Sequence, residues 1–105
     1  MGLPRVQFDT VEDVANVFSQ EGQGDMVGFQ ILGTWMGTIT FEATVPGAGG
    51  TFVSIMAVNV ATNVAATTTT ANGIFRIVSD GIDIRARFST DTSGTANVWP
   101  FQRLV

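Results

Sequence analysis

The chain has 105 residues, enough for one domain whose core folds without a disulfide or a metal ion. It contains no cysteine, which excludes disulfide frameworks and thiolate zinc sites. Only 13% of the residues are charged, against about a quarter in an average protein, and the net charge of −4 disfavours nucleic acid and anionic membranes as partners. Such sparse charge indicates a surface covered by copies of the chain or by another protein, the alternative being a monomer with a surface of Thr, Ser, Asn and Gln.

The first 24 residues are expected to form an N-terminal arm or short helix, packed on or reaching from a domain at residues 25–105. Asp9 to Gln20 is the only helix candidate, since Val11, Val14 and Phe18 fall at helical spacing after a capping Asp9 or Thr10. An extended arm that ends in a strand at Ala15–Ser19 is the alternative. The N-terminus lacks the pattern of a signal peptide, so the chain is expected to be made and kept in a cytoplasm unless something carries it out.

From Asp25 onward the hydrophobic period is two, which is typical of strands. Met26–Leu32 is predicted as a strand that Gly33 breaks. Across Thr38–Val45 apolar residues alternate with Thr38, Thr40, Glu42 and Thr44, the pattern of a sheet with one buried and one wet face. Pro46–Gly50 is predicted as a hairpin loop before a strand at Thr51–Val58.

The second half of the chain continues in the same way. Thr62-Asn63 separates strand Thr51–Val58 from strand Val64–Thr70, and Asn72-Gly73 is a turn before strand Ile74–Val78. The last strands are predicted from Ile82 to Ser89 and from Thr95 to Val105, with a loop at Asp91–Gly94. Seven or eight strands at this spacing predict an all-β fold, an antiparallel β-sandwich that is jelly-roll-like.

Five aromatic residues are the expected large core fillers: Trp35, Phe41, Phe75, Phe88 and Trp99. Two tryptophans in a small domain are usually core or interface anchors. A sugar-stacking platform made by Trp35 and Trp99 is the functional alternative.

Catalysis is disfavoured because His, Lys, Cys and Tyr are all absent, which removes the usual general bases and nucleophiles. Carboxylate pairs such as Glu42 with Asp83 are the remaining enzyme chemistry, but both are predicted on solvent faces, where a carboxylate keeps its ordinary pKa. Asp80-Gly81-Ile82-Asp83 and Asp91-Thr92 offer oxygen ligands without EF-hand spacing, and Gly47–Gly50 has no following lysine or helix to bind phosphate. We therefore expect no enzyme, no catalytic or metal site and no cofactor.

Three segments carry a resemblance: Gly33-Thr34-Trp35-Met36-Gly37-Thr38-Ile39-Thr40-Phe41-Glu42, the threonine-rich run Ala65 to Arg76, and the strand Ile82 to Arg87. From about Asp25 to Phe88 the chain resembles a small β-sandwich module of tailed-bacteriophage virion proteins. It departs from that module at the hairpin, where Val45 to Gly50 replaces an aspartate-glycine turn, and in the N-terminal segment.

A module of this size standing alone resembles a capsid cement or decoration protein. The resemblance implies a homo-oligomer, such as a trimer, on the capsid surface of a virion, bound to the major capsid protein and bridging its subunits, with Met1 to Gln20 as the arm. Deletion of Met1 to Ser19 is then expected to leave a folded core that no longer binds particles. A carbohydrate-binding module of a phage fibre and a tail or neck component are the alternatives.

Overall fold

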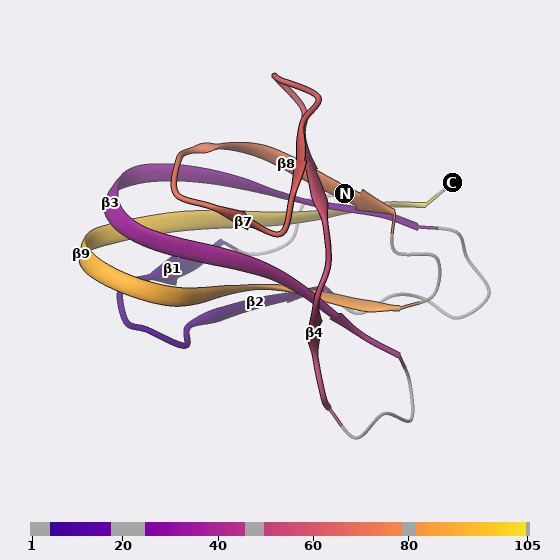
Figure 1. The fold of residues 1–105 in the computed structure, drawn as a ribbon, viewed down its shortest axis with the longest axis horizontal. Helices are drawn as coiled ribbons and strands as arrows, with labels where there is room; N and C mark the ends of the chain where they lie inside the picture. The colour runs from indigo at the N-terminus through magenta and orange to yellow at the C-terminus, as the bar shows by residue number, and fades with distance from the viewer. Residues whose placement is uncertain (1–4, 18–24, 46–49, 79–81, 105) are drawn as a thin grey trace.

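The computed structural model describes residues 5–17, 25–45, 50–78 and 82–104, and within these ranges all regular structure is β-strand (Figure 1). The described strands are β1 (Val6–Phe8), β2 (Val14–Val17), β3 (Asp25–Thr44), β4 (Val53–Ser54), β5 (Ala57–Asn59), β6 (Ala65–Ala66), β7 (Thr68–Thr69), β8 (Gly73–Val78) and β9 (Asp83–Leu104). All of them are hydrogen-bonded into one antiparallel sheet. The prediction of an all-β antiparallel fold is therefore confirmed.

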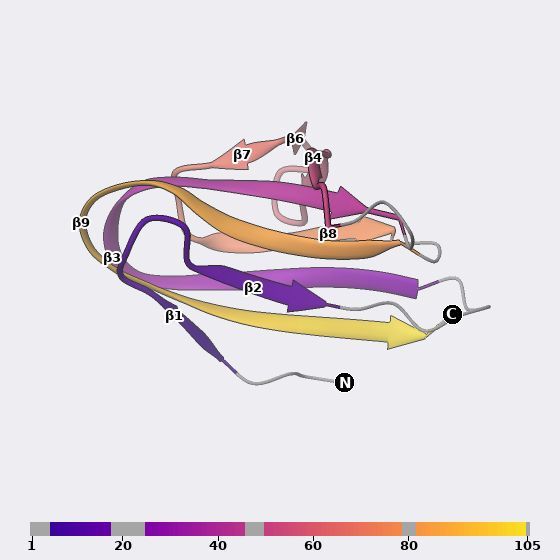
Figure 2. The same cartoon turned by 90° about the horizontal axis from the view of Figure 1, so that it is seen from below.

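Two long strands, β3 and β9, form the backbone of the fold. They pair from Asp25↔Leu104 to Thr44↔Asp83, with register shifts between Met36 and Gly37 and between Thr38 and Ile39. Both bend back at the same end of the molecule, so that the first half of each lies over its own second half (Figure 2). The sheet is thus folded into two facing layers, with order β1-β9-β3-β8-β5-β6 along its main path, while β2 pairs with β9, and β4 and β7 pair with β3.

The bend passes through the two places where the sequence predicts a break and a loop. Gly33 pairs with Ala96 and Gly94 pairs with Trp35, so the strand break at Gly33 and the loop at Asp91–Gly94 are both wrong. Gly33 and Gly94 have φ of 115° and 81°, values that disfavour L side chains, and each lies against a carbonyl oxygen of the paired strand. These glycines let two paired strands turn together, and sequence periodicity cannot separate that role from a loop.

The core lies between the two layers and is filled by alternate residues of the strands. Phe29 and Phe41, from the two halves of β3, stack with ring centroids 6.1 Å apart, and Phe41 also packs on Phe75 of β8. The predicted inward residues of strand 26–32, namely Val27, Phe29 and Ile31, are fully buried, as are Ile84, Ala86 and Phe88 of β9. Three of the five predicted large core fillers, Phe41, Phe75 and Phe88, are confirmed.

The N-terminal segment contributes strands to the sheet. Asp13 ends a tight turn in which its Oδ2 accepts hydrogen bonds from the backbone N–H groups of Asp9 and Thr10, and β2 then pairs with β9. The helix predicted from Asp9 to Gln20 is wrong over the described residues 9–17, because Ala15 and Val17 alternate into the core with period two. The alternative strand at Ala15–Ser19 agrees with β2 as far as Val17, and residues 18–24 lie outside the described part.

Candidate protein-interaction surfaces

An ion-pair cluster covers the outer face of β3 and β9. Arg85 Nε donates a 2.7 Å hydrogen bond to Glu42 Oε1, and Arg87 Nε donates a 3.0 Å hydrogen bond to Glu42 Oε2. The pairing of β3 with β9 brings the three residues together, since Glu42 lies directly opposite Arg85, and Arg87 is two residues further along β9, opposite Thr40. Glu42 is only 6% exposed, so its predicted position on a wet face is wrong.

Two further contacts complete the cluster. The Phe52 ring stacks on the Arg85 guanidinium, 3.8 Å from the ring centroid, and Arg87 Nη1 reaches Glu12 Oε1 at 2.7 Å. Burial raises the pKa of Glu42, but the hydrogen bonds and charges of Arg87 and Arg85 outweigh it and hold that pKa below the ordinary value. Glu42 is therefore ionised at neutral pH and lacks the raised pKa that a general acid requires.

The described acidic candidates Asp83 and Asp91 lie at different places along β9. Asp83 lies opposite Thr44 at the start of β9, and Asp91 lies opposite Gly37 at the bend. Within residues 5–17, 25–45, 50–78 and 82–104, no group of three or more metal-ligating side chains was found. Asp80, Gly81 and Gly47–Gly49 lie outside the described residues.

The two tryptophans have different environments. Trp35 is half-buried, donates a 2.7 Å hydrogen bond from Nε1 to Asn72 Oδ1, and packs edge-on against Phe88 of the core. Trp99 is 37% exposed, with the Arg5 guanidinium 5.9 Å from its ring centroid. The prediction of Trp99 as a core filler is therefore wrong, and its ring is the more accessible of the two.

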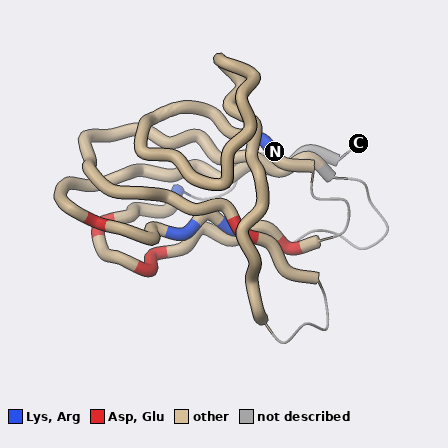
Figure 3. Tube along the Cα trace, in the orientation of Figure 1, with Lys and Arg blue, Asp and Glu red and all other residues tan. Residues whose placement is uncertain are grey.

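One long part of the chain carries no charge and presents apolar side chains to solvent. From Ala43 to Phe75 the sequence has no Asp, Glu, Lys or Arg, and this uncharged segment includes β4, β5, β6 and β7. Figure 3 shows the described strands and connections between β4 and β8 in tan throughout. Six of its large apolar side chains are exposed: Val45, Val53, Met56, Val60, Val64 and Ile74.

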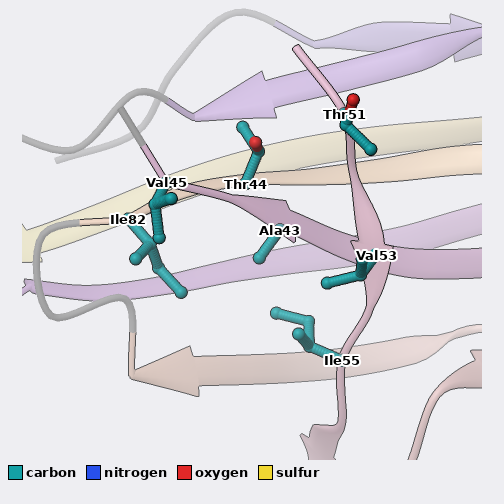
Figure 4. Close-up of a pocket in the computed structure, with 7 residues that line it drawn as sticks. All are labelled: Ala43, Thr44, Val45, Thr51, Val53, Ile55 and Ile82. Atoms are coloured by element: carbon teal, nitrogen blue, oxygen red, sulfur yellow. The ribbon is translucent and has the colours of Figure 1, made fainter. Parts of the chain in front are cut away.

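The uncharged segment contributes most of an open apolar pocket of about 360 Å³, where the end of β3 meets β4 and the residue before β9 (Figure 4). The side chains that line it are Ala43, Thr44, Val45, Thr51, Val53, Ile55 and Ile82. None of them is charged, and five of the seven are Ala, Val or Ile, so a group that fills the pocket removes mainly apolar surface from water. The low overall charge was predicted from the composition, but the uncharged segment was not, although the absence of charged residues between Glu42 and Arg76 is visible in the sequence.

Comparison with known proteins gives the fold. No protein-family model matches the chain, and no curated protein matches it. The crystal structure of the SPBc2 prophage-derived protein YomS matches with a TM-score of 0.67 and 13% identity, covering 95% of this chain and 94% of that one. The crystal structure of the PBSX exported protein XepA matches with a TM-score of 0.73 and 20% identity over 96% of this chain, which spans 38% of that protein. At these identities the likeness shows a shared fold and nothing of the activity.

Proposed function

We propose that this chain is a phage structural protein that acts through protein contacts, and specifically a capsid cement or decoration protein. The observation that carries the proposal is the uncharged segment with its exposed valines and apolar pocket. An exposed apolar surface of this kind is typical of a surface that another protein covers. The fold shared with a prophage-derived protein and the virion-module resemblance of residues 25–88 both favour a phage context.

The proposed mechanism is burial of this surface between neighbouring subunits. Each square ångström of apolar surface removed from water contributes roughly 25 cal/mol, so bridging contacts of this kind stabilise a shell without any covalent bond. The partner is the major capsid protein and the location is the capsid surface. The two facing layers of the folded sheet favour the sandwich, jelly-roll-like arrangement within this proposal.

The N-terminal segment is a poor candidate for the arm that bridges neighbouring subunits. Residues 6–8 and 14–17 pair with β9, and Phe8 is fully buried against Phe88. This part of the chain belongs to the core, so we assign bridging to the uncharged segment instead. Deletion of Met1 to Ser19 should then unfold the domain, in contrast to the folded remnant that the arm predicts.

Imaging of intact particles tests the proposal. Particles of the virus that encodes the chain would be prepared with native protein and with Val53→Glu, and density for the chain would be located by cryo-electron microscopy. We expect native protein on the capsid surface and a large loss of occupancy for Val53→Glu. Val11→Glu is the matched control, because it adds the same charge at an exposed valine outside the uncharged segment.

Three outcomes would count against the proposal. Density confined to the tail or neck would replace the cement role with the tail component, and absence from particles would overturn a virion role altogether. Equal occupancy of native protein and Val53→Glu would show that the uncharged segment is not the contact.

The exposed ring of Trp99 favours glycan binding as a second candidate, which loss of glycan binding in Trp99→Ala would support.

A further inference from the structure

The outer side of one layer carries a second group of exposed apolar side chains. In the layer built on the first half of β3, Trp99 of β9 lies opposite Gln30, and Gln30 lies opposite Ile74 of β8. Residues that pair in this way, and those two positions further along the same strands, point to the same side of a sheet. Four exposed apolar residues therefore share this side: Leu32, Ile74, Val78 and Trp99.

Two arginines lie on the same side of the sheet. Arg76 follows Ile74 by two residues on β8, and the Arg5 guanidinium lies over the ring of Trp99. Both arginines are exposed. We call this surface the Trp99 face, and it consists of Arg5, Leu32, Ile74, Arg76, Val78 and Trp99.

The two arginines have no carboxylate partner among the side chains that the structure describes. Arg5 Nη1 donates a 3.4 Å hydrogen bond to Asn97 Oδ1, and Arg76 takes part in no ion pair within the described residues. Arg85 and Arg87, in contrast, are both paired with glutamate. Figure 3 shows the described acidic residues gathered in the lower part of the view, away from β8. Although acidic residues outnumber basic ones by nine to five, the Trp99 face is left with unpaired positive charge.

This combination of residues is typical of a surface that binds another protein. Protein interfaces are enriched in aromatic residues and arginine, and tryptophan and arginine contribute most often to their binding energy. One exposed arginine is unremarkable, but here two arginines accompany an exposed tryptophan and three exposed aliphatic side chains. A partner that covers the face removes both guanidinium groups from water, and a desolvated cation is costly unless an anion pairs with it.

We propose that the Trp99 face binds a partner protein whose contact surface is apolar and places carboxylates opposite Arg5 and Arg76. The inference rests on the proposed cement role and names the second of the two contacts that a bridge between subunits needs. The first contact is the uncharged segment, whose pocket lies at the end of the second half of β3. The Trp99 face is built on the first half of β3, in the other layer (Figure 2). One chain can therefore hold two neighbours at once.

Binding of the purified full-length chain to particles that lack it tests this contact. Native protein and variants would be titrated onto particles of a virus from which the gene is deleted, and bound protein would be measured after the particles are sedimented. Arg76→Gln should raise the Kd about tenfold, because it removes a charge-assisted hydrogen bond across the contact. Val11→Glu is the matched control, because it also makes the net charge more negative by one at an exposed residue. It should change the Kd by less than about twofold.

Salt separates a charged contact from a purely apolar one. The Debye length falls from about 10 Å at about 0.1 M salt to about 3 Å at about 1 M. Binding of native protein should weaken over this range. The double variant Arg5→Gln/Arg76→Gln should bind more weakly at low salt and lose most of this salt dependence, whereas Trp99→Ala should weaken binding at both salt concentrations.

The outcomes separate this inference from the cement role. Unchanged thermal unfolding would show that the variants fold. If the folded arginine variants bind particles like native protein and with the same salt dependence, the acidic partner is wrong and the cement role stands. If native protein does not bind particles at all, the cement role fails and this inference fails with it.

Two further results would assign the Trp99 face to a different occupant and overturn the proposal. If Arg76→Gln dissociates an oligomer of the native chain in sedimentation velocity, the face is covered by a second copy. If the arginine variants lose binding to heparin, an anionic polysaccharide, while they keep binding to particles, the face is a glycan site.

Discussion

Glu42→Gln tests the ion-pair cluster, the most buried charge in the described part of the chain. The substitution keeps the shape and one acceptor oxygen but removes the charge that two arginines share. A hydrogen bond to a charged group contributes about 1.5–3 kcal/mol, and breaking a fully buried ion pair costs about 3–5 kcal/mol. The arginine side chains remain 23–24% exposed, so water partly replaces the lost partner. We therefore expect a loss of about 2–3 kcal/mol in the free energy of unfolding.

Urea unfolding followed by tryptophan fluorescence measures this loss, and thermal unfolding should show a decrease of about 10 °C. Glu12→Gln is the matched control, because Glu12 contacts the same Arg87 but is 66% exposed, and its loss should cost about 0.5 kcal/mol. Equal effects of the two substitutions would refute the reasoning that burial gives Glu42 its importance.

The pH dependence follows from the lowered pKa of Glu42. A group whose pKa is lower in the folded than in the unfolded chain stabilises the fold fully above its ordinary value, here 4.5, and less as pH falls through the lowered pKa. The difference in stability between native protein and Glu42→Gln should therefore be largest at neutral pH and shrink below pH 4.5. A difference that is constant between pH 7 and strongly acidic conditions would contradict this origin.

Three further predictions concern the bend, the N-terminal strands and the tryptophans. Gly94→Ala should lower the free energy of unfolding by about 3 kcal/mol, because a Cβ there meets the Thr34 carbonyl. Gly50→Ala, with the same φ of 81° but open space around it, should lower it by about 1 kcal/mol. Equal losses for the two variants in urea unfolding would contradict the collision at Gly94. Phe8→Ala should lose about 3–5 kcal/mol by the same assay, and a loss below 1 kcal/mol would mean that β1 is not part of the core. Trp99→Ala should change the free energy of unfolding by less than about 1 kcal/mol. Trp35→Ala should lower it clearly more, because the substitution removes the hydrogen bond to Asn72 and the contact with Phe88.

Strand periodicity predicted most of the sheet because alternate burial is a local property of the sequence. Val27, Phe29 and Ile31 are buried together for the same reason that they alternate with polar or small residues. The antiparallel pairing of β3 with β4 was predicted as well, since Ala43 pairs with Val53 on the two sides of the glycine-rich residues 46–50. The continuous bend was not predictable, because a glycine in a turning strand and a glycine in a loop give the same local pattern.

The candidate surfaces were harder to predict because they depend on what covers each face. Glu42 alternates with Phe41 and Ala43 as a wet residue would, but Arg85 and Arg87 of β9 bond to it, and Phe52, just before β4, stacks on Arg85. Trp99 was assigned to the core from its size, whereas it lies on the outward side of β9 between buried Val98 and Pro100. Neither arrangement has a signal within a few residues of the position concerned.

Charged side chains and exposed apolar side chains lie in different parts of this chain. Open strand edges usually carry charged residues that prevent pairing with other chains. Here the acidic residues Asp9, Glu12 and Asp13 lie at the β1–β2 turn, while the strands from β4 to β7 have no such protection. An unprotected apolar surface is a liability for a free monomer and an advantage for a subunit that is always covered. The ion-pair cluster of Glu42, Arg85 and Arg87 meets the uncharged segment at Phe52, so substitutions at the exposed valines of that segment do not remove the hydrogen bonds of the cluster.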